Sequence, residues 1–132
     1  MTVMKKLLSV CAVVVVGMST ASAAPRDRQA VPEATLEGKP VSCVQTSNIR
    51  STSVHGDSVI DFYMTGGKVY RNTLPMSCPS LGFEERFLYK TSIGQLCSVD
   101  IITVLQSPGL SQGPSCGLGE FQPVKIVKAA KN

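Results

Sequence analysis

A β-hairpin followed by a cysteine between two prolines most constrains how this 132-residue chain can fold. Two β-prone runs, 58–64 and 68–74, flank a turn at 65–67, where two glycines permit the positive φ angles of a tight hairpin. A proline stands just before and just after the region of Cys78, and proline cannot donate a hydrogen bond to a sheet. The chain is therefore predicted to leave the sheet after the second strand.

The loop length of this hairpin decides which side chains face each other. A two-residue loop places Phe62 opposite Arg71. A three-residue loop, with Gly67 in the left-handed conformation, instead sets Asp61 opposite Arg71 and also pairs Phe62 with an aromatic partner, Tyr70. Cross-strand ion pairs and aromatic pairs contribute about 0.2–1 kcal/mol each, and an arginine among core residues costs desolvation. We therefore expect the three-residue loop.

That loop also fixes which side chains face the core. Five of them then share the inner face: Ile60, Phe62, Met64, Tyr70 and Leu74. Asn72 falls among them, so its amide needs hydrogen-bond partners to avoid a penalty of about 1–3 kcal/mol.

The opposite face of the hairpin is the predicted ligand site and carries Tyr63, Arg71 and Asp61. A tyrosine beside an arginine can bind a sugar or a peptide by stacking and by charged hydrogen bonds. The stronger alternative is that a loop at 107–119 covers Tyr63 and Val69 as a second core layer, because exposed aromatic and β-branched pairs favour aggregation.

The first 23 residues match a secretory signal peptide. Lys5 and Lys6 precede an apolar run at 7–18, and small residues at 21–23 suit a signal peptidase. The run is shorter than the about 20 residues that a membrane-spanning helix takes. We expect cleavage after Ala23, removal of Cys11 with the signal, no transmembrane segment afterwards, and export to the periplasm or out of the cell.

Four cysteines remain after cleavage, and an even number in an exported chain predicts two disulfides. They are Cys43, Cys78, Cys97 and Cys116. Their spacing contains no C-x-x-C pair, which disfavours a four-cysteine metal site. We expect neither a metal nor a cofactor.

Three pairings of these cysteines are compatible with the sequence. We predict Cys78 with Cys97, because Cys78 lies where the chain leaves the hairpin and Cys97 begins the strand expected to pair with 87–91. The remaining pair, Cys43 with Cys116, brackets the domain and would close a long loop, which stabilises by about 4 kcal/mol in the chain-entropy model.

Short strands separated by turn residues dominate the rest of the chain. Residues 24–40 are expected to be a flexible N-terminus with at most a helical turn after Pro32, 41–127 a β domain, and 128–132 a solvated tail. Within the domain we expect one helical turn at 81–86 and a long loop at 107–119. Seven segments are candidates for strands: 41–44, 49–54, 58–64, 68–74, 87–91, 96–105 and, at an edge, 121–127. The absence of helical periodicity predicts an all-β fold, a small disulfide-stapled barrel or sandwich of five to six short strands.

The charge and the single histidine exclude some functions. Without Lys5 and Lys6, the 13 basic side chains fall to 11 against 9 acidic ones, which leaves no basic footprint for nucleic acid. His55 lies in a His-Gly-Asp turn, where Asp57 could orient it as a general base. Neighbours in a tight turn point apart and no nucleophile is placed beside them, so an exposed turn histidine is expected.

Carboxylates offer a second possible chemistry, because two of them facing each other across a cleft can catalyse glycoside hydrolysis. The candidates are Asp61, Asp100, Glu84 and Glu85. A simpler role exists for each: an ion pair with Arg71 for Asp61, a strand bend fixed by Asp100, and a solvated turn for both glutamates. We therefore predict no catalytic residue.

Several short motifs together resemble those of a known family. They are Tyr70-Arg71-Asn72-Thr73-Leu74, Cys78-Pro79, Leu81-Gly82-Phe83, Leu96-Cys97-Ser98-Val99-Asp100 with Ile102 and Val104, and Ser115-Cys116-Gly117-Leu118-Gly119-Glu120-Phe121. With them the chain resembles, over roughly residues 41–124, a family of small uncharacterised exported proteobacterial proteins, a domain of unknown function. The resemblance implies no activity and no site residues.

Together these features favour a non-enzymatic binding or structural module of the cell envelope. Its expected partner is another envelope protein, contacted through an exposed strand edge, or a glycan. The alternative is a small carboxylate-dependent hydrolase acting on an envelope glycan or ester. The ligand and the oligomeric state are left open.

Overall fold

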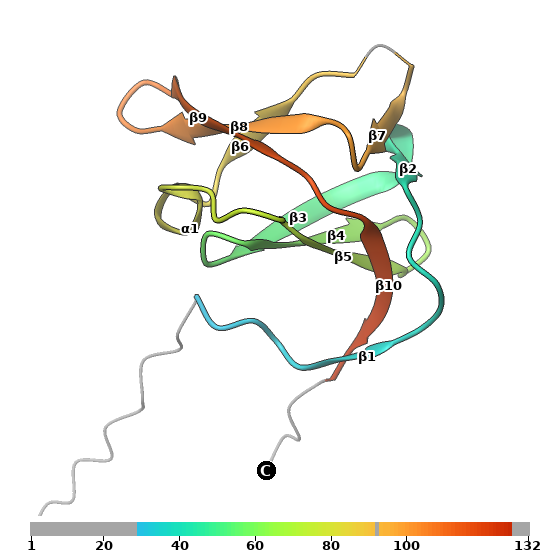
Figure 1. Ribbon diagram of the computed structural model, residues 1–132. Coiled ribbons are helices and arrows are strands. Elements are labelled where there is room, and N and C mark those ends of the chain that lie inside the picture. The colour runs from blue at the N-terminus through green and yellow to red at the C-terminus, as the bar shows by residue number, and fades with distance from the viewer. Residues whose placement is uncertain (1–28, 92, 128–132) are drawn as a thin grey trace, which may run out of the picture.

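The computed structural model describes residues 29–91 and 93–127, so the predicted signal peptide and the predicted tail at 128–132 lie outside the described residues. About half of these residues lie in strands and very few in helices, which confirms the all-β class (Figure 1). The strands are β1 (Ala34–Leu36), β2 (Cys43–Gln45), β3 (Ile49–His55), β4 (Val59–Met64), β5 (Val69–Thr73), β6 (Phe87–Tyr89), β7 (Gln95–Cys97), β8 (Ile101–Gln106), β9 (Ser111–Gly117) and β10 (Phe121–Ile126). A 3-10 turn, Thr46–Asn48, and the one-turn helix α1, Leu81–Glu84, complete the described elements. The expectation of five to six strands is therefore too low.

The strands form two stacked layers rather than a closed barrel. One layer is a five-stranded sheet in the order β1-β10-β5-β4-β3, and the other is a three-stranded sheet in the order β6-β8-β9. The pair β2-β7 lies at one end of the stack, and all neighbouring strands are antiparallel (Figure 1). Of the two predicted architectures, the sandwich fits.

The hydrophobic core fills the space between the two layers. Phe62 of β4 lies at its centre, with ring centroids 5.3 Å from Phe121 and 6.3 Å from Phe87, both in edge-to-face geometry. The predicted inner face of the hairpin is confirmed, because Ile60, Phe62, Met64 and Leu74 are buried and Tyr70 packs against them.

The predicted three-residue hairpin loop is also confirmed. Gly67 has a φ of 90°, and the register pairs Asp61 with Arg71. Asn72 is fully buried, and Gly119 satisfies its amide: Nδ2 donates to the Gly119 carbonyl (2.7 Å) and Oδ1 accepts from the Gly119 N–H (2.8 Å).

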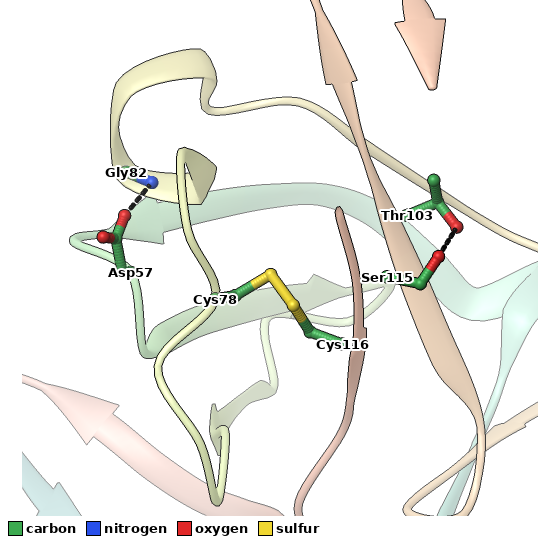
Figure 2. Close-up of a disulfide and its surroundings, with 6 residues drawn as sticks. All are labelled: Asp57, Cys78, Gly82, Thr103, Ser115 and Cys116. Atoms are coloured by element: carbon green, nitrogen blue, oxygen red, sulfur yellow. Dashed lines mark hydrogen bonds between the residues drawn. A yellow bond between two sulfur atoms is a disulfide. The ribbon is translucent and has the colours of Figure 1, made fainter. Parts of the chain in front are cut away.

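The predicted disulfide pairing is wrong, although all four cysteines are paired. Cys43 bonds Cys97. Cys78 bonds Cys116, and Figure 2 shows this second disulfide. The prediction assumed that Cys97 begins a strand beside 87–91, but β7 pairs with β2 and sets Cys43 directly opposite Cys97, with Cα atoms 4.0 Å apart. The Cys78–Cys116 bond then joins the segment after β5 to β9 of the other layer. Two disulfides indicate an oxidising, extracytoplasmic environment.

The N-terminal boundary of the folded region lies earlier than predicted. Instead of a flexible segment or a helical turn, residues 34–36 form β1, which pairs with β10. This pairing places β10 between β1 and β5, so the last predicted strand is not at an edge. The mixture of prolines and charges before residue 41 hid a short strand that is stabilised by a partner about 90 residues away.

Two further segments differ from the sequence prediction. The apolar run at 96–105 is divided into β7 and β8, because Asp100 Oδ2 accepts a hydrogen bond from the Cys97 N–H (2.7 Å) and turns the chain there. Val99 is consequently 87% exposed. The predicted loop at 107–119 contains β9, whose pairing with β8 accommodates its glycines and its proline at a sheet edge.

Candidate functional site

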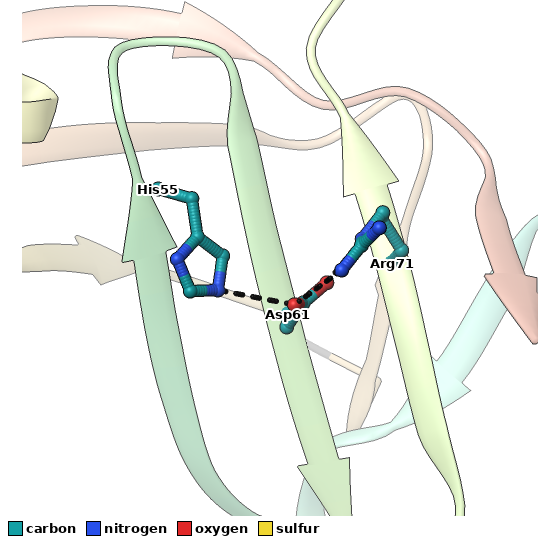
Figure 3. Close-up of polar contacts among 3 residues, drawn as sticks. All are labelled: His55, Asp61 and Arg71. Atoms are coloured by element: carbon teal, nitrogen blue, oxygen red, sulfur yellow. Dashed lines mark hydrogen bonds and ion pairs between the residues drawn. The ribbon is translucent and has the colours of Figure 1, made fainter. Parts of the chain in front are cut away.

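Three polar side chains from neighbouring strands meet on the outer face of the five-stranded sheet (Figure 3). Asp61 of β4 accepts two hydrogen bonds from Arg71 of β5, from Nε to Oδ1 (2.8 Å) and from Nη2 to Oδ2 (3.0 Å). On its other side His55 Nε2 of β3 lies 3.1 Å from Oδ2. Both carboxylate oxygens are therefore engaged within the protein. We call His55, Asp61 and Arg71 the polar triad.

The polar triad is almost closed to solvent. The side chain of Asp61 is fully buried, and those of His55 and Arg71 are 12% and 15% exposed. The hydrogen bonds from Arg71 to Asp61 raise the pKa of the guanidinium, although burial acts in the opposite direction. Such an enclosed, bidentate pair joins strands rather than offering a free charge to a ligand.

The N-terminal segment runs along this outer face. Gln29 Nε2 donates to the Gly82 carbonyl of α1 (2.6 Å), and at the other side of the sheet Val127 donates to the carbonyl of Glu33 (2.9 Å). Between these points the chain lies on the side of the sheet away from β6, β8 and β9 (Figure 1). The N-terminal segment, and not the 107–119 region, therefore lies on the same side of the sheet as the polar triad.

The predicted ligand site of Tyr63, Arg71 and Asp61 is only partly assembled. Asp61 and Arg71 meet as predicted, but the burial of Asp61 removes it from any ligand surface. The 107–119 region belongs to the other sheet and does not cover the half-buried Tyr63. Tyr63 instead lines a shallow hollow of about 390 Å³ with Val69, Val124 and Ile126.

Histidine 55 belongs to the polar triad, which the sequence prediction missed. Asp57, its expected partner, accepts a hydrogen bond from the Gly82 N–H through Oδ1 (2.7 Å) instead (Figure 2). The β3–β4 turn pairs His55 with Val59, which places the imidazole diagonally beside Asp61 on the same face. A three-residue turn at 56–58 sets this register, so recognising its length from the sequence would have predicted the contact between His55 and Asp61.

The other candidate carboxylates lie at separate places. Asp100 fixes the bend after β7, as the sequence predicts, and Glu84 Oε2 accepts from both the N–H and the hydroxyl of Ser107 (3.2 and 3.1 Å). Glu85 is exposed, and no side-chain partner engages it among residues 29–91 and 93–127. Within that same part of the chain, no group of three or more histidines, cysteines and carboxylates is arranged to hold a metal ion.

A second surface lies at the free edge of β3, which is one of the two edge strands of its sheet. A hollow of about 310 Å³ follows this edge and is lined by Thr52, Ser53, Val54, His55 and Glu85. Residues 50–52 are exposed, and no described strand pairs with this side of β3. We call this surface the β3 edge.

The backbone groups available at the β3 edge follow from the hairpin. The Met64 N–H donates to the carbonyl of Lys68, the residue just before β5 (2.8 Å), so the backbone groups of Met64 point toward β5. In an antiparallel strand, the N–H and C=O groups of successive residues point alternately to the two neighbouring strands. The residues of β4 that point to β3 are therefore the partners of Ser51, Ser53 and His55. Thr52 and Val54 consequently direct their N–H and C=O groups away from the sheet.

The described helices include none that is long and apolar enough to cross a membrane. The resemblance noted from the sequence motifs stays a prediction. Comparison of the chain with protein-family models, with curated proteins and with solved structures finds no match.

Proposed function

We propose that the protein is an exported, non-enzymatic binding module of the periplasm or cell exterior that takes up an extended polypeptide along the β3 edge. The observation that carries this proposal is the unpaired edge of β3, where Thr52 and Val54 direct backbone donors and acceptors into a hollow. An extended chain added there continues the ladder of the sheet, which is a common way for β domains to bind peptides.

The β3 edge is the least protected edge among the described strands. Proteins blunt free edges with prolines, lysines or very short strands. β1 and β6 have three residues each, and β9 contains Pro114. β3 has seven residues without proline or lysine, and only the register shift between Ile49 and Ser51 interrupts it. An edge left open in this way supports a binding role.

The expected complex is reversible. Thr52 and Val54 offer four backbone groups, and each net hydrogen bond contributes about 0.5–1.5 kcal/mol, so about 2–6 kcal/mol is gained before the ordering of the partner is subtracted. Side chains beside the ladder add specificity, and the exposed carboxylate of Glu85 favours a partner with a basic residue at that point.

The alternative of a carboxylate-dependent hydrolase has no comparable support. Asp61, Asp100 and Glu84 each accept hydrogen bonds from groups of the protein itself. Glu85 and Asp100 line two separate hollows, whereas glycoside hydrolysis takes a pair of carboxylates on opposite sides of one substrate.

The test is photocrosslinking in intact cells with a photoreactive residue in place of the exposed Ser51. We expect a crosslinked product that Thr52→Pro abolishes, because proline removes the outward N–H while the inward bonds to β4 remain. Thr52→Val, which keeps this N–H, is the matched control and should retain the product. Unfolding temperatures of both variants close to that of the wild type verify the fold. No product, or a product unchanged in Thr52→Pro, refutes the proposal.

A further inference from the structure

We propose that the segment bound at the β3 edge is β3 of a second copy of this chain, paired antiparallel about a two-fold axis at Ser53. The inference rests on the proposed function, because it names the partner of the same edge. Homo-oligomers with two-fold symmetry are the most frequent assemblies, and they use one surface twice.

The backbone of β3 is complementary to itself in this register. A two-fold axis at Ser53 sets Thr52 opposite Val54 of the second copy, and the reverse pair follows by symmetry. Thr52 and Val54 are the residues whose backbone groups point outward, so each donor meets an acceptor in both pairs. The two five-stranded sheets then form one continuous sheet.

The side chains near the axis leave room for this approach. Ser51 and Ser53 are small and Thr52 is exposed, so these three positions place no large side chain between the two strands. Ser51 of one copy stands opposite His55 of the other, and the His55 imidazole is turned away toward Asp61. The pairing thus leaves the polar triad in place.

Charge complementarity supports the same register. This register places Arg50 of the second copy opposite Gly56, which follows the end of β3. Helix α1 packs closely at this point, since a Cβ added to Gly82 would lie 2.7 Å from the Gly56 carbonyl carbon. Glu85 follows directly after α1 and lines the β3 edge. Both Arg50 and Glu85 are exposed without a side-chain partner among the described residues, so two Arg50–Glu85 pairs form across the axis.

A charge-reversal series measured by sedimentation equilibrium of the mature protein tests these pairs. We expect Arg50→Glu to raise the dimer Kd about tenfold or more, because like charges then meet twice across the interface. Glu85→Arg should act in the same way, and the double variant should restore association. Arg86→Glu is the matched control, because this substitution makes the same change of charge at a residue that does not line the β3 edge.

A single introduced cysteine tests the position of the axis. Residues directly opposite in a non-hydrogen-bonded antiparallel pair have Cα atoms about 4.5 Å apart, which suits a disulfide. The chain already contains such a cross-strand bond between Cys43 and Cys97. Ser53→Cys should therefore give a covalent dimer on mild oxidation, whereas Thr52→Cys, offset from its own copy, should not.

The outcomes separate this inference from the proposed function. If the protein stays monomeric at all concentrations up to about 1 mM, the proposed dimer is refuted. Crosslinking through Thr52→Cys in place of Ser53→Cys refutes it as well. If crosslinks to a different polypeptide then persist in cells and disappear in Thr52→Pro, the proposed function stands without the dimer. If those are missing as well, both are refuted.

Discussion

Asn72 makes two hydrogen bonds to Gly119 through its side-chain amide, donating to the carbonyl and accepting from the N–H of the same residue. These bonds join β5 to the segment that leads from β9 into β10, 47 positions later in the sequence. A buried amide with two partners therefore fixes the point where the chain returns from one layer of the sandwich to the other.

Replacement of Asn72 by leucine should destabilise the protein by about 2–4 kcal/mol, because the N–H and C=O of Gly119 both lose their partner in a buried place. The measurement is urea unfolding followed by circular dichroism. Thr73→Val, at the exposed neighbouring position, is the control and should change little. A loss below about 0.5 kcal/mol, the size of an ordinary surface effect, would contradict this role of Asn72.

Gly119→Ala should be destabilising by about 1–3 kcal/mol, the usual effect of overpacking. A Cβ there would collide with the Thr73 carbonyl oxygen and lie 3.5 Å from Asn72 Oδ1. Gly117→Ala gives a matched control two residues away, where a Cβ meets nothing within 4 Å. Chemical denaturation of both variants checks the difference, and equal stabilities would refute it.

Arg71→Leu should cost about 3–5 kcal/mol, because it leaves the carboxylate of Asp61 buried without its cation. His55→Asn should cost much less, since Asp61 keeps both bonds from Arg71. A double-mutant cycle with Asp61→Leu should show strong coupling between positions 61 and 71. Purely additive losses in unfolding free energy would show that the pair contributes nothing.

Each disulfide should contribute about 4 kcal/mol in the chain-entropy model, because the bonds close loops of similar length, 54 and 38 residues apart. Peptide mapping of the unreduced protein should recover Cys43 with Cys97 and Cys78 with Cys116. Removal of both cysteines of one pair, measured by thermal unfolding, checks the contribution of each bond. Recovery of Cys78 linked to Cys97 would contradict the structure.

Features set by residues close in the sequence were predictable, and those set by distant pairings were not. The Asp61–Arg71 pair follows from a turn of three residues, so cross-strand chemistry alone selects the register. The partner of Cys97 depends instead on β2 pairing with β7 across about 50 residues, and no local pattern around either cysteine reports that choice.

The candidate sites show the same division. The pairing of Arg71 with Asp61 was found because both lie within one hairpin, but the full burial of Asp61 and its contact with His55 of β3 were not predicted. The β3 edge was not located from the sequence, because strand order in a sheet depends on all the strands together. A Ser- and Thr-rich strand without proline or lysine was its only local signal.

The position of β10 between β1 and β5 has a consequence for the order in which the chain can assemble. Synthesis proceeds from the N-terminus, and β10 follows every other described strand in the sequence. β1 therefore emerges first but has nothing to pair with until almost the whole chain has been made. The five-stranded sheet is therefore completed last, at the place where the two ends of the folded region pair with each other.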